Sequence, residues 1–303
     1  EEDAVVDIFH NDALEADGGL HDCPNLIRYQ VKKGSYSLCT YEPYLFKYLK
    51  VVFRNTGKVK NIRAQVCTYW YPVKESGTFA CSDPVLNRIF KGALKTLQSN
   101  TLDIFMDCPE RERGGWLCDS TWTARAAYMM LGDLRVEKDF MENFFNTSKD
   151  DYENALFPEV YPGHGVGEGK SCGISTWSFW LLIELCEYLR RSGDEEFLLQ
   201  VKRRVEEFVT GMEAYENEAG LLEGLPNVFI DWSAANDTEN TQPISVPANA
   251  VYAYMLIELG KTYQEEAWEK KGRAMQETLR TIAPVPKESG KYPAYPDAEV
   301  LED

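Results

Sequence analysis

The feature that most constrains the fold is a change of hydrophobic period at Ser82-Asp83-Pro84. Residues 44–54 are mainly apolar and aromatic, an Asn55-Thr56-Gly57-Lys58 turn follows, and residues then alternate from Ile62 to Thr68, up to Tyr69-Trp70-Tyr71, which is typical of a β-hairpin. From Val85 to Leu97, apolar residues recur at helical spacing, and Asp83 followed by Pro84 is typical of a helix N-terminus. The sequence therefore predicts a β segment followed by a helical domain.

The helical pattern continues downstream with alternating short and long connections. Residues 1 to about 40 are expected to be irregular, with turns at Asp17-Gly18-Gly19 and Lys33-Gly34-Ser35. Long irregular stretches at 157–172 and 220–247 separate the later helices. The expected helices cover about 83–97, 119–131, 134–146, a segment containing Trp177 that ends at 192–194, 195–214, 248–258 and 265–282. This arrangement is typical of antiparallel helix pairs with functional loops at one end.

The charge balance limits the partners. The chain has 32 basic and 49 acidic residues and a net charge of -17, which argues against nucleic acid or an anionic membrane and suits a neutral ligand. No apolar run is long enough to span a bilayer. The N-terminus, Glu1-Glu2-Asp3, does not resemble a signal peptide, although a processed chain would have lost one.

Cysteine and histidine usage argues against a metal site. The eight cysteines are scattered without a Cys-x-x-Cys pair, and the histidines are His10, His21 and His164. A structural zinc site and a Ser-His-Asp triad are therefore not expected, and neither a metal nor a cofactor is predicted. Most cysteines are expected to be buried thiols. Free thiols favour an intracellular location and still allow a periplasmic one.

A charged loop from Asp103 to Asp119 joins two of the expected helices. Pro109 and the Gly114-Gly115 pair prevent a helix from running through it. The loop places three acids, Asp107, Glu112 and Asp119, beside two arginines and Trp116. Glycoside hydrolysis needs one carboxylic acid and a second carboxylate, and a tryptophan offers a face on which a sugar ring can stack. The structural alternatives are an N-cap for Asp119, a turn acid for Asp107, and ion pairs.

The same loop resembles a known family. The run from Asp107 to Asp119 closely resembles the motif of bacterial α-L-rhamnosidases, an inverting, family-78-like group of glycoside hydrolases with an (α/α)6-barrel catalytic domain. Similarity continues in order through Gly77–Asn87, Phe157–Pro162, the Trp177 helix and Asp231-Trp232. It covers about Tyr44 to Ile282.

The resemblance implies a fold and a site. The expected fold is mainly α, an incomplete (α/α)6-barrel portion at 79–303 preceded by a β-sandwich-like segment at 1–78. Glu112 would be the general acid. The residues expected to contact the sugar are Asp107, Arg111, Trp116, Asp119, Asp231 and Trp232. Trp177 is a further stacking candidate. Core packing is the favoured interpretation for Trp177 and Trp180, which lie on an apolar helix. For Trp232, core packing and sugar stacking both stay open.

Two departures from the family pattern stand out. Cys118 occupies a position that is usually glycine. The family's general-base glutamate lies farther downstream than Asp303, and only about seven helical segments can be identified, too few to close a barrel. The loop acids Glu159, Glu223 and Glu239 do not match the base motif. The chain is therefore expected to be either a fragment or a divergent member.

The sequence thus predicts an inverting exo-α-L-rhamnosidase that acts on terminal rhamnose in glycans or glycosides. The alternative is a non-catalytic or inactive rhamnoside-binding relative that lacks the general base. A third interpretation, an α-fucosidase of similar architecture, is disfavoured by the Asp107–Asp119 motif. The expected partner is a carbohydrate, and a homo-oligomer is allowed.

Overall fold

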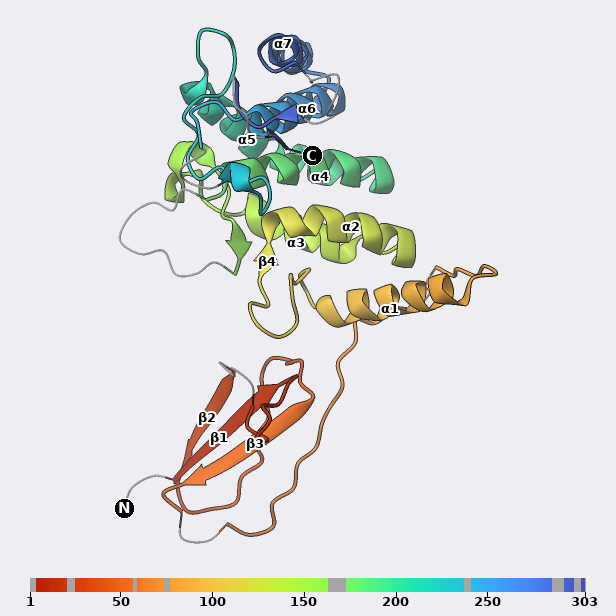
Figure 1. Cartoon of the computed structure of the whole chain (residues 1–303), viewed down its shortest axis with the longest axis vertical. Helices are drawn as coiled ribbons and strands as arrows, with labels where there is room; N and C mark the ends of the chain where they lie inside the picture. Colours follow the sequence, from red (N-terminus) through yellow and green to blue (C-terminus); the bar gives the residue numbers. More distant parts are fainter. Residues whose placement is uncertain are drawn as a thin grey trace. The chain divides into compact units, whose positions relative to one another are not determined.

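The computed structural model describes residues 4–20, 25–56, 59–73, 77–162, 173–236, 241–284, 292–296 and 301–302. His164 and Glu239 lie outside these ranges. The chain divides into two compact units (Figure 1). The first unit comprises Glu1–Lys74, Phe79–Leu102 and Met106–Gly114, and the second comprises Glu75–Thr78, Asp103–Phe105 and Gly115–Asp303. The fold is mainly helical with a small strand segment near the N-terminus, as expected.

The first unit contains a three-stranded antiparallel sheet in the order β2-β1-β3, formed by β1 (Ala4–Asn11), β2 (Leu26–Val31) and β3 (Tyr48–Arg54). The expectation of an irregular stretch up to about residue 40 is therefore wrong. So is the predicted hairpin, because β3 pairs with β1, and the described residues of 59–73 form no strand. Alternation identifies a strand-forming segment, but it does not specify which segment will pair with it.

The centre of this sheet holds a buried acid. Asp7 on β1 accepts hydrogen bonds from Arg28 Nε at 2.6 Å and from Arg54 Nε at 2.9 Å. These two guanidinium groups, Arg28 first, lower the pKa of Asp7 to about 2. The carboxylate thereby cross-links β1 to both of its neighbours.

The first helix, α1 (Pro84–Asn100), begins as the sequence predicts. Asp83 is the N-cap, its Oδ1 accepts a hydrogen bond from the Val85 N–H at 2.7 Å, and Pro84 occupies the first helical position. Upstream, the Cys81 N–H donates to Asn87 Oδ1 at 3.0 Å, and Asn87 Nδ2 donates to the Cys81 carbonyl at 2.8 Å. The period change at this point therefore coincides with a capped helix start.

The second unit is built from three helix pairs. A short link joins the two helices of each pair: α2 (Leu117–Leu131) and α3 (Arg135–Phe145), α4 (Ser175–Ser192) and α5 (Glu195–Met212), and α6 (Val246–Tyr263) and α7 (Glu266–Ile282). Of the three pairs, α6 and α7 make the most extensive contacts. These helices match the predicted ones in order, and α6 continues five residues beyond the predicted end at Glu258. The remaining elements are β4 (Gly115–Trp116), β5 (Val160–Tyr161), β6 (Tyr292–Pro293), β7 (Leu301–Glu302) and 3₁₀ turns at Lys149–Asp151, Glu153–Ala155, Glu213–Tyr215 and Ala234–Asn236.

One predicted cap is wrong. The N-cap of α2 is Trp116, so Asp119 lies inside the first turn. The helix begins earlier because β4 pairs with β5 and the Leu117 N–H donates to the Glu159 carbonyl at 2.8 Å. This partner is distant in sequence, so local pattern could not reveal it.

Helices α2 and α4 run in the same direction. Ser120, near the start of α2, contacts Glu184, and Arg125, farther along α2, contacts Glu187 one turn farther along α4. Contacts that advance together along both helices require parallel axes. The N-termini of α2 and α4 therefore lie at the same end of the unit (Figure 1).

Helix α6 continues this parallel layer. The ring of Phe179 on α4 lies 5.1 Å from that of Tyr252 on α6, and farther along both helices Arg190 bonds Glu258 at 2.6 Å. Helix α7 packs closely against α6. A Cβ atom on Gly272 of α7 would lie only 2.5 Å from the Ala253 carbonyl oxygen of α6, so the contact requires glycine. The N-termini of α2, α4 and α6 thus share one end.

The core of the second unit is largely aromatic. Its largest fully buried side chains include Tyr252, Phe140, Phe144, Phe157, Phe179, Phe197 and Phe208. The expectation of mostly buried cysteines is wrong. Among the described cysteines, Cys186 is buried, Cys108 and Cys118 are half-buried, and Cys39, Cys67 and Cys81 are exposed. In the described ranges, no helix combines the length and apolarity that crossing a bilayer requires.

Candidate functional site

The motif loop of the first unit closes on itself. The Asp107 N–H donates to the Gly114 carbonyl at 3.0 Å, and the Gly114 N–H donates to Asp107 Oδ1 at 2.9 Å. Asp107 is thus a turn acid, as the structural alternative proposed, with one carboxylate oxygen engaged by the loop.

Glu112 lies on the outer part of this loop. Its N–H donates to Cys108 Sγ at 3.2 Å, and its Oε1 forms an ion pair with Arg111 Nη2 at 2.5 Å. The Glu112 side chain is 32% exposed, and that of Arg111 is 75% exposed. Glu112 therefore combines a defined backbone position with a carboxyl group that solvent can reach, which a proton donor to a bound substrate requires.

The neighbouring Arg113 anchors the loop. Its Nη1 donates to Glu42 Oε2 at 2.8 Å, and its guanidinium group lies 4.4 Å from the centre of the Tyr44 ring. The Leu45 N–H donates to the Pro109 carbonyl at 3.3 Å. The two arginines beside Glu112 thus differ: Arg113 is fixed within the first unit, and Arg111 is mostly exposed.

In the second unit, the loop before α6 is bound to the start of α4. Ser175 Oγ donates to the Pro226 carbonyl, and Thr176 Oγ1 donates to the Phe229 carbonyl. Asn227 Nδ2 donates to the Gly173 carbonyl at 2.9 Å. These bonds hold residues 226–229 against the N-terminal end of the parallel helices.

A chain of aromatic rings occupies this end. Trp116 and Trp177 meet edge to face at 5.6 Å, Trp177 lies 6.0 Å from Phe229, and Phe229 lies 5.0 Å from Trp232. Trp116 and Trp177 are half-buried, whereas Trp232 is 92% exposed. The open question for Trp232 is thus decided against core packing. Trp177 and Trp180 are half-buried, and the Trp180 ring lies 5.2 Å from that of Trp122.

Two of the predicted acids lie in the same unit. Asp119 is exposed on the first turn of α2, and Asp231 is exposed in the loop before α6, where its Oδ1 accepts a hydrogen bond from the Trp232 N–H at 2.7 Å. The predicted set is therefore divided: Trp116, Asp119, Asp231 and Trp232 belong to the second unit, and Asp107, Arg111 and Glu112 belong to the first.

Sequence reasoning missed Phe229 and a buried polar cluster. Phe229 is the link between Trp177 and Trp232, and no local pattern distinguishes it. The cluster surrounds Glu184 on α4, which is fully buried and shares its helix face with Glu187 and Arg191. Within the described part of the chain, no group of three His, Cys, Asp or Glu residues is arranged to hold a metal ion.

Helix pairs that carry Asp119, Asp231 and the exposed Trp232 at one end fit the architecture of an α/α-toroid glycosidase domain. Residues 74–282 match the family model described as the bacterial alpha-L-rhamnosidase 6 hairpin glycosidase domain. The chain belongs to this family. The expected fold, an incomplete α/α toroid preceded by a short strand segment, is confirmed.

Solved structures show the same fold. The chain resembles the GH78 family rhamnosidase of Bacillus sp. GL1, with 21% identity, a TM-score of 0.75 and coverage of 97% of this chain and 31% of that one. It also resembles the Klebsiella oxytoca rhamnosidase with rhamnose bound (15% identity, TM-score 0.65, coverage 95% and 58%). The Streptomyces avermitilis alpha-L-rhamnosidase complexed with L-rhamnose is similar as well, with 20% identity, a TM-score of 0.66 and coverage of 96% of this chain and 28% of that one.

The chain therefore spans about a third of the length of the Bacillus structure it matches. Comparison with curated protein sequences found no match.

Proposed function

We propose that the protein is an α-L-rhamnosidase that hydrolyses terminal α-L-rhamnosyl linkages with inversion of configuration. The observation that carries this proposal is the Asp107–Asp119 motif, in which Glu112 presents a solvent-accessible carboxyl group beside Arg111. Membership of the rhamnosidase six-hairpin family supports the same reaction class.

In this proposal, Glu112 donates a proton to the glycosidic oxygen as the bond to the anomeric carbon breaks. Asp107 accepts a sugar hydroxyl through Oδ2, since the loop engages its Oδ1. Asp119 and Asp231 accept further hydroxyls, and Arg111 donates to the sugar. An inverting enzyme also needs a carboxylate that activates water, and we assign no residue of this chain to that role.

Trp116 and Trp232 are proposed to stack against the sugar. Both belong to the aromatic chain at the N-terminal end of α2, α4 and α6, and the exposure of Trp232 leaves its ring face accessible. Apolar ring faces suit the C–H surfaces of a deoxy sugar because both surfaces leave water on contact.

A rhamnoside-binding protein without hydrolytic activity is the second candidate. Two observations favour this candidate: the chain spans 31% of the length of the Bacillus structure, and no general base is assigned within the chain. This candidate keeps the same sugar-contacting residues and lacks turnover.

Both candidates are tested by incubating the chain, and any longer gene product that contains it, with nitrophenyl α-L-rhamnoside and nitrophenyl α-L-fucoside. Release from the rhamnoside alone supports the rhamnosidase. Binding of L-rhamnose without release by either protein supports the second candidate. Turnover of the fucoside alone, or neither binding nor turnover, contradicts both.

A further inference from the structure

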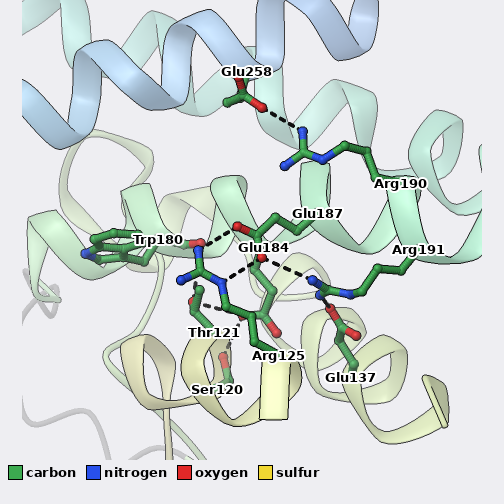
Figure 2. Close-up of polar contacts among 10 residues, drawn as sticks. All are labelled: Ser120, Thr121, Arg125, Glu137, Trp180, Glu184, Glu187, Arg190, Arg191 and Glu258. Atoms are coloured by element: carbon green, nitrogen blue, oxygen red, sulfur yellow. Dashed lines mark hydrogen bonds and ion pairs between the residues drawn. The ribbon is translucent and has the colours of Figure 1, made fainter. Parts of the chain in front are cut away.

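A cluster of charged side chains lies where α2, α3 and α4 meet (Figure 2); Glu137 and Glu184 are buried in it, and Arg125, at its edge, is 35% exposed. It contains three carboxyl groups, Glu137, Glu184 and Glu187, and two guanidinium groups, Arg125 and Arg191. We propose that Glu184 is a positioning residue that stays protonated and, by hydrogen bonding to Ser120 and Thr121, fixes the first turn of α2. This turn carries Asp119, so the role in sugar binding rests on the proposed function.

Charge pairing leaves Glu184 without a cation. Glu187 accepts hydrogen bonds from Arg125 at 2.5 and 2.8 Å and from Arg191 at 3.1 Å, and Glu137 pairs with Arg191. Glu184 is fully buried and forms no ion pair among the described residues. Two guanidinium groups balance two carboxylates, and a third buried charge would be uncompensated. The cluster is therefore neutral when Glu184 holds a proton.

The hydroxyl groups around Glu184 lead to the same protonation state. Ser120 Oγ lies 2.7 Å from both the Leu117 carbonyl oxygen and Glu184 Oε2, yet a hydroxyl has one hydrogen. A protonated Glu184 satisfies both contacts, because it donates to Ser120 while Ser120 donates to Leu117. Thr121 Oγ1, 3.2 Å away, can then donate to the same Glu184 Oε2.

An ionised Glu184 would be poorly solvated. Its Oε1 is buried and has no hydrogen-bond partner in the described part of the chain. Burial raises the pKa of Glu184 to about 8, and the nearby carboxyl group of Glu137 raises it as well. The groups that face it are Arg125 and Cys118 from α2, Glu137 from α3, and Glu187 and Arg191 from α4. Burial raises the pKa of Cys118 to about 12, so this thiol adds no charge.

These bonds act on one turn. The Leu117 carbonyl, Ser120 and Thr121 all belong to the first turn of α2, and Asp119 lies between them. The Leu117 N–H is already fixed by the Glu159 carbonyl. Glu184 supplies the two closest side-chain contacts of this turn with α4, and Thr121 Oγ1 lies farther, 3.5 Å, from the Trp180 carbonyl oxygen. When this attachment is lost, the turn and its exposed carboxylate are free to shift.

Two substitutions test the proposal through L-rhamnose binding, measured by calorimetry from pH 6 to 9.5. The carboxamide of Glu184→Gln donates and accepts like the protonated acid, so this variant should match the wild-type affinity within about twofold at pH 7. Wild-type affinity should fall several-fold above pH 8, and Glu184→Gln should lack this decline. Glu184→Leu should bind at least tenfold more weakly at every pH.

Several results would overturn the proposal. An affinity of Glu184→Gln at pH 7 as low as that of Glu184→Leu would show that the ionised form is the functional one. If Glu184→Leu bound L-rhamnose as tightly as the wild-type protein does, the attachment would not position Asp119. Glu137→Gln tests the charge balance: it removes a carboxylate that raises the pKa of Glu184 and leaves Arg191 without that partner, so the alkaline decline should begin at a lower pH than in wild type.

A second readout separates this proposal from the proposed function. Hydrogen–deuterium exchange at a single pH should be faster for residues 117–121 in Glu184→Leu than in wild type, with α5 unchanged, while Glu184→Gln matches wild type. If the wild-type chain binds no rhamnose, the proposed function fails, but the exchange experiment still tests the attachment. If residues 117–121 exchange at the same rate in Glu184→Leu as in wild type, Glu184 does not fix the first turn of α2.

Discussion

Replacing Gly115 with alanine should loosen the strand pair that precedes α2. A Cβ atom at this position would lie 2.6 Å from the Tyr161 carbonyl oxygen and 2.9 Å from Phe140 Cε2. The Tyr161 oxygen is backbone on the paired strand β5, so it cannot rotate away as a side chain could. Strand β4 must therefore move, and with it Trp116.

The expected cost follows from this geometry. Overpacking of a closely packed site costs about 1–3 kcal/mol. For a folded unit of this size, each kcal/mol lowers the melting temperature by roughly 2–4 °C, so a cost of about 2 kcal/mol gives a drop of roughly 4–8 °C. L-Rhamnose affinity should fall as well, since Trp116 is displaced.

Calorimetric melting and rhamnose titration check this prediction. The matched control is Gly92→Ala on α1, where an added Cβ meets nothing within 4 Å and alanine favours the helix by up to about 1 kcal/mol. If Gly115→Ala has the melting temperature and the L-rhamnose affinity of the wild type, the β4–β5 contact accommodates the extra Cβ atom and does not hold Trp116 in place.

Three further predictions follow from individual residues. Trp232→Ala should leave the melting temperature unchanged because the ring is 92% exposed, yet weaken rhamnose binding by roughly three- to tenfold; unchanged affinity would remove Trp232 from the site. The free energy of unfolding should fall as pH rises from about 5 to 8, because folded Glu184, with a pKa of about 8, keeps a proton that the unfolded chain releases near 4.5. In urea titrations, the free energy of unfolding of Glu184→Gln should fall less over this pH range than that of the wild type. An equal fall in both proteins would show that Glu184 does not cause it. Proton NMR during turnover should first detect β-L-rhamnose, and first release of the α-anomer would refute inversion.

The helices were predictable because their determinants are local. Asp83 and Pro84 mark the start of α1 within a few residues, and apolar spacing outlines each later helix. The partner of β3 was not predictable, because many segments can satisfy an alternating strand and the choice of β1 depends on long-range packing. The start of α2 at Leu117 likewise depends on β5.

The candidate site divides in the same way. The motif and its loop character could be predicted from the residues, because Pro109 and the glycines exclude a helix. The aromatic chain through Trp177 and Phe229 could not, since it joins β4, the first turn of α4 and the loop before α6, which only the parallel helices bring together. The environment of Glu184 was not predictable either, because it depends on the packing of α2 and α3 around α4.

The most direct test of the proposed reaction compares two substrates with the Glu112→Gln variant of the active protein. A general acid contributes about 10²–10⁴ to turnover when the leaving group needs a proton, and an activated phenol needs little protonation. The proposal therefore predicts a loss of kcat of roughly 10²–10⁴ on natural rhamnosides and a much smaller loss on nitrophenyl rhamnoside. Equal losses on both substrates with a lower melting temperature, or a raised KM with kcat intact, would contradict the role of Glu112 as the acid.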